Sequence, residues 1–151
     1  MTVPAEQVTP SLLREWSLPE PGGSKHSRGH VVVIGGARST PGAVLLAGIA
    51  ALRVGAGVLA MAVPDDVAIP LAIAVPESAV SGWPDFTAPE LSAQGRRGLT
   101  DLLHQASAVL LGPGLDDPEL TQLLLSLVAE ELPPHVPVVL DAFALGAVPE
   151  R

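Results

Sequence analysis

Short apolar runs alternate with longer stretches of helical character along the first half of the chain. Residues 31–35 open with four β-branched residues and run into a glycine pair, which predicts a strand followed by a tight turn. Pro41 suits the first turn of a helix, and residues 43–54 are almost entirely apolar, so we expect a helix that is covered on most of its sides. Residues 58–62 are expected to return as a second strand. A strand–helix–strand unit of this kind predicts two parallel strands.

The second half of the chain continues the alternation of strand and helix patterns. The predicted elements are helices over 65–73 and 89–105, a strand over 108–111, a helix that opens at Asp117-Pro118, and a strand over 137–140. Residues 74–87 are less regular, and no strand is predicted there. The alternation predicts a layered α/β fold with a mostly parallel sheet. Residues 1–28, with a short helix near Pro10, are expected to form an N-terminal arm ahead of a domain over 29–151.

Composition and charge exclude several classes of function. The 151 residues carry a net charge of −8 and a single lysine, Lys25, so no general nucleic-acid-binding surface is expected. The sequence has no cysteine, which rules out a disulfide framework and a cysteine nucleophile. Its N-terminus lacks the apolar core of a signal peptide, so we expect a cytoplasmic protein. The apolar run over 42–63 is interrupted by Arg53 and by two glycines, so no membrane span is expected.

The turn after the first predicted strand is a candidate binding site for an anion. Gly35 and Gly36 end the strand, and a helix that begins near Gly42 leaves its first backbone N–H groups without partners inside the helix. Such groups favour a phosphate or another polar part of a ligand. The same glycines would also serve an ordinary tight turn between strand and helix, and the residues leave both interpretations open.

Two later strand ends carry further candidates. Gly112 and Gly114 flank a proline after the third predicted strand, where the absence of a Cβ atom would let a ligand approach the backbone. An ordinary turn is the alternative. Asp141 follows the last predicted strand and would bind a ribose hydroxyl, a metal-bound water or a substrate amide, or else cap the helix that starts near Phe143. The four histidines show no metal-ligand spacing, so no metal-binding side chains are predicted.

These candidates are expected to share one cleft. The carboxyl ends of parallel strands meet at one edge of a sheet, so the turns at 35–43 and 112–114 and the side chain of Asp141 should converge there. An arrangement with Ala43 and Gly114 at opposite edges would exclude such a cleft. On this interpretation Gly114→Val weakens ligand binding with little effect on folding, because the new Cβ would stand in the path of the ligand.

Several segments, taken in order, carry a resemblance to a known family. They are Lys25 to Gly29 followed by Val31-Val-Val-Ile-Gly-Gly36, Thr40-Pro-Gly-Ala-Val-Leu-Leu-Ala47, Ala50-Ala-Leu-Arg-Val-Gly-Ala-Gly57, Val75-Pro-Glu77, Leu111-Gly-Pro-Gly-Leu115 and Val138-Val-Leu-Asp-Ala142. In this order they resemble the ADP-dependent NAD(P)H-hydrate dehydratases, a carbohydrate-kinase-like family of nicotinamide repair enzymes. The resemblance runs from residue 9 to the end of the chain and implies a ribokinase-like fold.

The resemblance implies the dehydration of hydrated NADH or NADPH, coupled to turnover of ADP, with ADP and Mg²⁺ as cofactors. It further implies that a phosphate group activates the hydroxyl of the hydrate as a leaving group. By position, Ala43 and the turn at 112–114 match the hydrate-binding side of the family's pocket. The resulting assignments are, for the hydrate, Ala43, Gly112, Gly114 and Asp141 and, for the nucleotide, Gly35, Gly36 and Gly42.

Two departures from the family pattern bear on function. The last strand is followed by Asp141-Ala-Phe-Ala144, so Phe143 puts a ring where the family has a small or acidic residue. Family members also continue well beyond the matching region, through the Gly-Ser-Gly-Asp segment with the catalytic aspartate. The chain thus resembles the N-terminal half of the domain, and its catalytic residues are expected elsewhere.

Two alternative functions stay open at this point. One is a related small-molecule kinase that acts on a vitamin precursor, and the other is a non-catalytic fragment that binds nucleotide. Whichever function applies, half of a domain without the other half exposes a sheet edge and apolar helix faces. We therefore expect either a homo-oligomer or completion of the fold by the rest of the domain.

Overall fold

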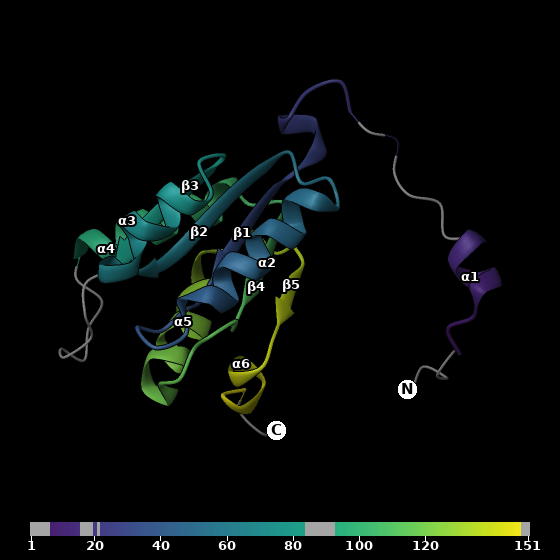
Figure 1. Ribbon diagram of the computed structural model, residues 1–151. Helices are drawn as coiled ribbons and strands as arrows, with labels where there is room; N and C mark the ends of the chain where they lie inside the picture. The colour runs from purple at the N-terminus through teal and green to yellow at the C-terminus, as the bar shows by residue number, and fades with distance from the viewer. Residues whose placement is uncertain (1–6, 16–19, 21, 84–92, 149–151) are drawn as a thin grey trace.

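The computed structural model describes residues 7–15, 20, 22–83 and 93–148 and has a layered α/β fold (Figure 1). Its strands are β1 (His30–Ile34), β2 (Val58–Pro64), β3 (Ser78–Trp83), β4 (Ala108–Leu111) and β5 (Val138–Leu140). Its helices are α1 (Pro10–Glu15), α2 (Pro41–Arg53), α3 (Asp65–Ala74), α4 (Ala93–Gln105), α5 (Pro118–Glu131) and α6 (Phe143–Gly146), with a 3₁₀ turn, η1 (His26–Arg28). The strands form a five-stranded parallel sheet in the order β3-β2-β1-β4-β5. The predicted α/β fold with a parallel sheet is confirmed.

All four predicted strands are present, and neighbouring strands pair in parallel. His30 lies opposite Val58 in the β1–β2 pair, and α2 makes the crossover between these strands, as predicted. β4 pairs with the other side of β1 and with β5. The central position of β1 brings its carboxyl end between those of β2 and β4. The turns after these strands therefore meet at one edge of the sheet.

Strand β3 is absent from the elements that the sequence pattern predicts. Its segment, Ser78–Trp83, holds small residues and a glycine, with Val80 as its single β-branched aliphatic residue. The strand forms because it pairs with β2 along its full length, from Ser78 opposite Leu59 to Trp83 opposite Pro64. Pairing with an already formed sheet outweighs a weak local preference, which a pattern search does not detect.

Apolar side chains fill both sides of the sheet. Successive residues of a strand point to opposite faces, so Val33 and Ile34 of β1 belong to different clusters. The first cluster contains Val33, Val44, Leu59, Met61, Val63, Val67, Leu71 and Val75. The second contains, among others, Val32, Ile34, Trp83, Leu99, Leu103, Val109, Leu111, Leu124 and Leu127. Helices α2 and α3 therefore pack on one face of the sheet, and α4 and α5 pack on the other.

The expectation that the apolar helix α2 is covered on most of its sides is wrong for the described residues. Val44 and Gly48 are buried in this helix, whereas Leu46 is 71% exposed. The buried positions face the sheet, since a Cβ atom on Gly48 would lie 3.0 Å from the side chain of Leu59. In α2, the buried residues are those on the face that packs against the sheet. The other faces are also apolar, so the amino-acid composition alone does not show which face is buried.

The N-terminal arm adds little to the core in the part that the structure describes. Helix α1 buries none of its residues, and η1 leads directly into β1. Trp16 and the first four positions of the predicted helix over 89–105 lie outside the described residues, and α4 begins at Ala93. In the described ranges, no helix has the length and apolarity needed to cross a membrane.

His30, at the start of β1, couples the stability of the fold to pH. Burial lowers the pKa of its imidazole below the ordinary value of 6.5, although a hydrogen bond with the backbone of Gln105 opposes the shift. Its Nε2 atom is buried and has no hydrogen-bond partner in the described part of the chain, so a proton there would be unsatisfied. The folded state therefore binds fewer protons at His30 than the unfolded state does, and stability falls as the pH drops below 6.5 and through the folded-state pKa.

We expect His30→Gln to flatten this pH dependence. Between about pH 8 and about pH 5, the variant should lose less free energy of unfolding than the wild-type protein, as measured by urea denaturation at each pH. His135→Gln, the same change at an exposed histidine, is the matched control. Parallel stability–pH curves for the wild type and His30→Gln would contradict the argument.

Candidate functional site

The turns that follow β1 and β4 touch each other at the carboxyl edge of the sheet. The backbone N–H of Gly36 donates to the carbonyl oxygen of Pro113 at 2.7 Å. The hydroxyl of Thr40 donates to the carbonyl oxygen of Gly114, also at 2.7 Å. A Cβ atom on Gly114 would lie 3.0 Å from that of Ala43. Ala43 and Gly114 are thus neighbours, and the opposite-edge arrangement that would have excluded a shared cleft does not occur.

Glycines in these turns allow backbone segments of the chain to approach one another. A Cβ atom on Gly35 would meet the carbonyl oxygen of Pro113, and one on Gly112 would meet that of Asp141. Gly112 and Gly114 also have φ angles of 130° and 73°, in the region that favours glycine. The ordinary-turn interpretation therefore accounts for these glycines by itself. Their contact with a ligand stays a prediction.

The expectation that Gly114→Val leaves folding almost unaffected is wrong. A Cβ atom at this position would lie 2.5 Å from the carbonyl oxygen of Thr40, well inside contact distance. The space beside Gly114 is filled by the turn that leads into α2. A side chain here disturbs the contact between two turns before it meets any ligand.

The first turn of α2 presents its backbone at the same edge of the sheet. Thr40 occupies the N-cap position, but its hydroxyl contacts Gly114 and does not cap the helix. Gly42 is exposed, and a Cβ atom added there would have no neighbour within 4 Å. The positive end of the helix dipole is therefore open next to Gly42, as an anion-binding role requires.

Asp141 follows β5 and reaches the other turns through its backbone. Its N–H donates to the carbonyl oxygen of Leu111 at 2.9 Å, and its own carbonyl lies against Gly112. The alternative role of its side chain as a helix cap is wrong, because α6 has Ala142 at its N-cap with no side-chain hydrogen bond. The Asp141 side chain is exposed, and its assignment to the substrate stays a prediction.

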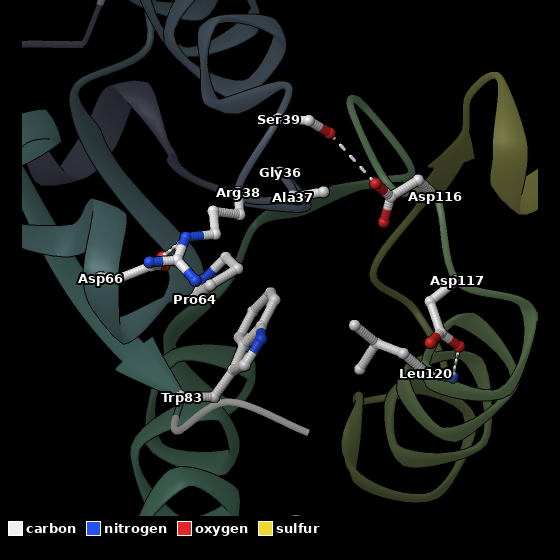
Figure 2. A pocket seen from close by; sticks show the side chains of 10 residues that line it. All are labelled: Gly36, Ala37, Arg38, Ser39, Pro64, Asp66, Trp83, Asp116, Asp117 and Leu120. Carbon is white, nitrogen blue, oxygen red and sulfur yellow. Dashed lines mark hydrogen bonds and ion pairs between the residues drawn. The ribbon is translucent and has the colours of Figure 1, made fainter. Parts of the chain in front are cut away.

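A pocket of about 350 Å³ opens beside these turns, at the carboxyl ends of β1, β2 and β3 (Figure 2). Its lining residues are Gly36, Ala37, Arg38, Ser39, Pro64, Asp66, Trp83, Asp116, Asp117 and Leu120. Of the predicted site residues, the described lining includes Gly36 and not Asp141. Ala43, Gly114 and Asp141 are not among the lining residues of this pocket, so the convergence of all the candidates on one cleft stays a prediction.

The polar residues at the pocket are held by short contacts. Arg38 Nε lies 3.2 Å from a carboxylate oxygen of Asp66, and the hydroxyl of Ser39 donates to Asp116 at 3.2 Å. Asp117 caps α5 by accepting a hydrogen bond from the N–H of Leu120 at 2.9 Å. The contacts of Arg38 and Ser39 tie the turn after β1 to the segments that follow β2 and β4.

Sequence reasoning missed most of these lining residues. Asp66 and Asp116 lie two and five residues beyond the ends of β2 and β4, whereas Asp141 directly follows β5, so the signal that singled out Asp141 does not extend to them. Trp83 had no such signal, because the strand that carries it was not predicted. Within the described residues, no group of three or more His, Cys, Asp or Glu side chains forms a candidate metal site.

The fold and the position of the site define a ribokinase-like protein. A ribokinase-like superfamily protein from Enterococcus faecalis matches 93% of this chain and 46% of its own, with 26% identity and a TM-score of 0.75. The ADP/ATP-dependent NAD(P)H-hydrate dehydratase from Bacillus subtilis, co-crystallised with ATP/Mg²⁺, matches 85% of this chain and 43% of its own, with 28% identity and a TM-score of 0.61.

The sequence defines the family within this fold. A family model for NAD(P)H-hydrate dehydratase matches residues 31–151. The ADP-dependent (S)-NAD(P)H-hydrate dehydratase of Xanthomonas campestris is 40% identical over 139 residues, which are 92% of this chain and 47% of the relative. The protein of the same name from Bacillus subtilis is 35% identical over 133 residues, 86% of this chain and 44% of its own. The chain belongs to the NAD(P)H-hydrate dehydratase family and spans about half the length of these relatives.

Proposed function

We propose that this chain binds hydrated NADH or NADPH as part of an ADP-dependent dehydratase, which removes water and restores the reduced nicotinamide ring. The observation that carries the proposal is the 40% identity to the Xanthomonas campestris enzyme across 92% of the chain. The names of the relatives favour this function over the kinase of a vitamin precursor. The alternative of a non-catalytic nucleotide-binding fragment is separated from it by the experiments below.

The residues of this chain bind and orient the ligand in this proposal. The hydrate lies against the turns that bring Ala43 and Gly114 together, with Gly112 and Asp141 at the neighbouring strand ends. Backbone N–H groups at the start of α2 hold an anionic group, because the acidic chain offers few positive side chains for that purpose. Gly42 gives this group access, since no described atom occupies the space beside it.

ADP and Mg²⁺ are the proposed cofactors. When bound, ADP supplies the phosphate that makes the hydroxyl of the hydrate a better leaving group. Among the described residues, no group of three or more His, Cys, Asp or Glu side chains could hold a metal ion by itself. We propose that Mg²⁺ arrives with the phosphates of the nucleotide, which are its usual ligands in such sites.

A Gly42→Ala variant tests the binding role of the α2 N-terminus. The new methyl group has open space around it and should leave the fold intact, but it would obstruct a ligand at the backbone N–H groups. Because Gly42 is assigned to the nucleotide, we expect binding of ADP, measured by isothermal titration calorimetry, to weaken about tenfold, as for one lost hydrogen bond. Gly23→Ala, another glycine with nothing within 4 Å, is the matched control. If Gly42→Ala and Gly23→Ala bound the ligand with equal affinity, the N-terminus of α2 would not be part of the binding site.

The edge of the sheet at β5 supports the proposal that the functional protein is a homo-oligomer or is completed by further residues of the domain. Val138 and Val139 are 39% and 59% exposed on this edge strand. Exposed apolar edges pair with other chains. We expect the isolated chain to self-associate in sedimentation velocity experiments and Val139→Lys to shift it toward the monomer. A wild-type chain that stays monomeric at high concentration would contradict this expectation.

The cellular location and the domain boundary are further proposals. We propose a cytoplasmic protein, in keeping with a sequence that has no cysteine. We also propose that residues 1–28 form an arm ahead of the binding domain, since the family match begins at residue 31.

A further inference from the structure

The pocket at the carboxyl ends of β1, β2 and β3 has an apolar back and a charged rim. Trp83, which is 2% exposed, and Leu120 lie on facing sides of it, and Pro64 lies beside Trp83 (Figure 2). Arg38 and Asp66 form one part of the rim, and Asp116 forms another (Figure 2). A pocket of about 350 Å³ is at the small end of the range for ligand sites. It has room for a ring and its substituents and not for a whole dinucleotide.

The charges around this pocket disfavour a phosphate. Arg38 is its cationic lining residue, and this guanidinium already lies 3.2 Å from the carboxylate of Asp66. Asp116 accepts a hydrogen bond from the Ser39 hydroxyl and Asp117 accepts one from a backbone N–H, so the contacts given for these two carboxylates in the described residues are with uncharged groups. The lining thus carries three carboxylates against one guanidinium. A dianionic phosphate placed among them would be repelled.

The same carboxylates favour a ligand with hydrogen-bond donors. Asp66 and Asp116 each use one oxygen in the contacts above, and a carboxylate accepts several hydrogen bonds. Hydroxyl groups of a ribose and the N–H groups of an amide or an exocyclic amine are the donors that a nucleotide offers. Pro64 and Leu120, which are half-buried, supply the apolar surface that the ring itself requires, and Trp83 adds only the small part of its side chain that is exposed.

We propose that this pocket is a subsite for an uncharged heterocyclic ring with its ribose, and that it excludes the phosphates of the same ligand. The inference rests on the proposed function, because the dinucleotide hydrate offers two such ends, the reduced nicotinamide riboside and the adenosine. Phosphate groups of the ligand then lie outside the pocket, toward the start of α2, which the chain reaches a few residues after Gly36.

The indole N–H signal of Trp83 reports on this pocket directly. The sequence has two tryptophans, so a Trp16→Phe variant leaves one indole signal in a ¹⁵N–¹H correlation spectrum of the full chain. Titration with reduced nicotinamide riboside and with adenosine tests the two ends of the dinucleotide. We expect at least one of them to shift the Trp83 signal saturably, and its 5′-monophosphate to bind about tenfold more weakly. The nucleoside that shifts the signal identifies the end of the dinucleotide that binds in the pocket. If both nucleosides shift it, the pocket recognises the ring and ribose that they have in common.

An Asp116→Asn variant tests whether the negative charge at the rim of the pocket, and not the shape of the rim, weakens the binding of a phosphate. The change keeps the size of an exposed side chain and removes one negative charge. We expect it to narrow the ratio between nucleoside and monophosphate affinities. Glu77→Gln, which removes one exposed carboxylate that does not line the pocket, should leave this ratio unchanged.

Two results would overturn the subsite. One is a Trp83 signal that neither nucleoside shifts, and the other is a monophosphate that binds more tightly than its nucleoside. The proposed function fails by a different measurement, namely the absence of calorimetric binding of hydrated NADH to the same chain. A chain that binds the hydrate while its Trp83 signal stays fixed would retain the proposed function and lose the subsite.

Discussion

Gly114→Val is expected to destabilise the fold by about 4 kcal/mol, which is a large part of the stability of a domain of this size. The Cβ atom of the valine would lie 2.5 Å from the carbonyl oxygen of Thr40, and the backbone at this position has a φ angle of 73°. Steric overlap and an unfavourable backbone conformation therefore act together. The midpoint of thermal unfolding should fall by roughly 10 °C, measured by circular dichroism.

Gly42→Val is the matched control for this experiment. It introduces the same side chain at a glycine of the adjoining helix start, where a Cβ atom has no neighbour within 4 Å. We expect its melting temperature to stay close to that of the wild type, because helix propensity changes little or improves between glycine and valine. If Gly114→Val also melted within a degree or so of the wild type, the contact between the turns after β1 and β4 would be wrong.

The isolated 151-residue chain is expected to show no ADP-dependent repair of hydrated NADH. The chain spans 47% of the length of the Xanthomonas campestris relative, and we expect the groups that stabilise the developing charge to lie outside the matched half. Loss of even one such group costs about 10²- to 10³-fold in rate, so loss of all of them should bring turnover below detection.

Recovery of the reduced-nicotinamide absorbance measures this turnover. The Xanthomonas campestris enzyme, assayed under the same conditions, shows that the hydrate and ADP are competent. Calorimetric binding of the hydrate to the isolated chain shows that its half of the site is folded. Turnover by the purified chain at a rate near that of the relative would mean that these residues supply the catalytic groups themselves.

The sequence alone identified the elements whose residues have strong local preferences. The β-branched run over 31–35 and the strands over 58–62, 108–111 and 137–140 are all present, and their parallel pairing followed from the crossover helix between the first two. The family resemblance also rested on local segments, which is why it could be drawn before any contact was known.

What only the tertiary structure decided depends on contacts between distant segments. β3 exists because β2 offers it a partner, and the pocket exists because that pairing places Trp83 near Leu120. Gly114 appeared to be open to a ligand, yet the structure fills that space with Thr40. A glycine in a sequence shows that a side chain is absent, and only the packed chain shows which atoms occupy the space. Local preference acts within a few residues, whereas the approach of two turns separated by some seventy residues is set by sheet order.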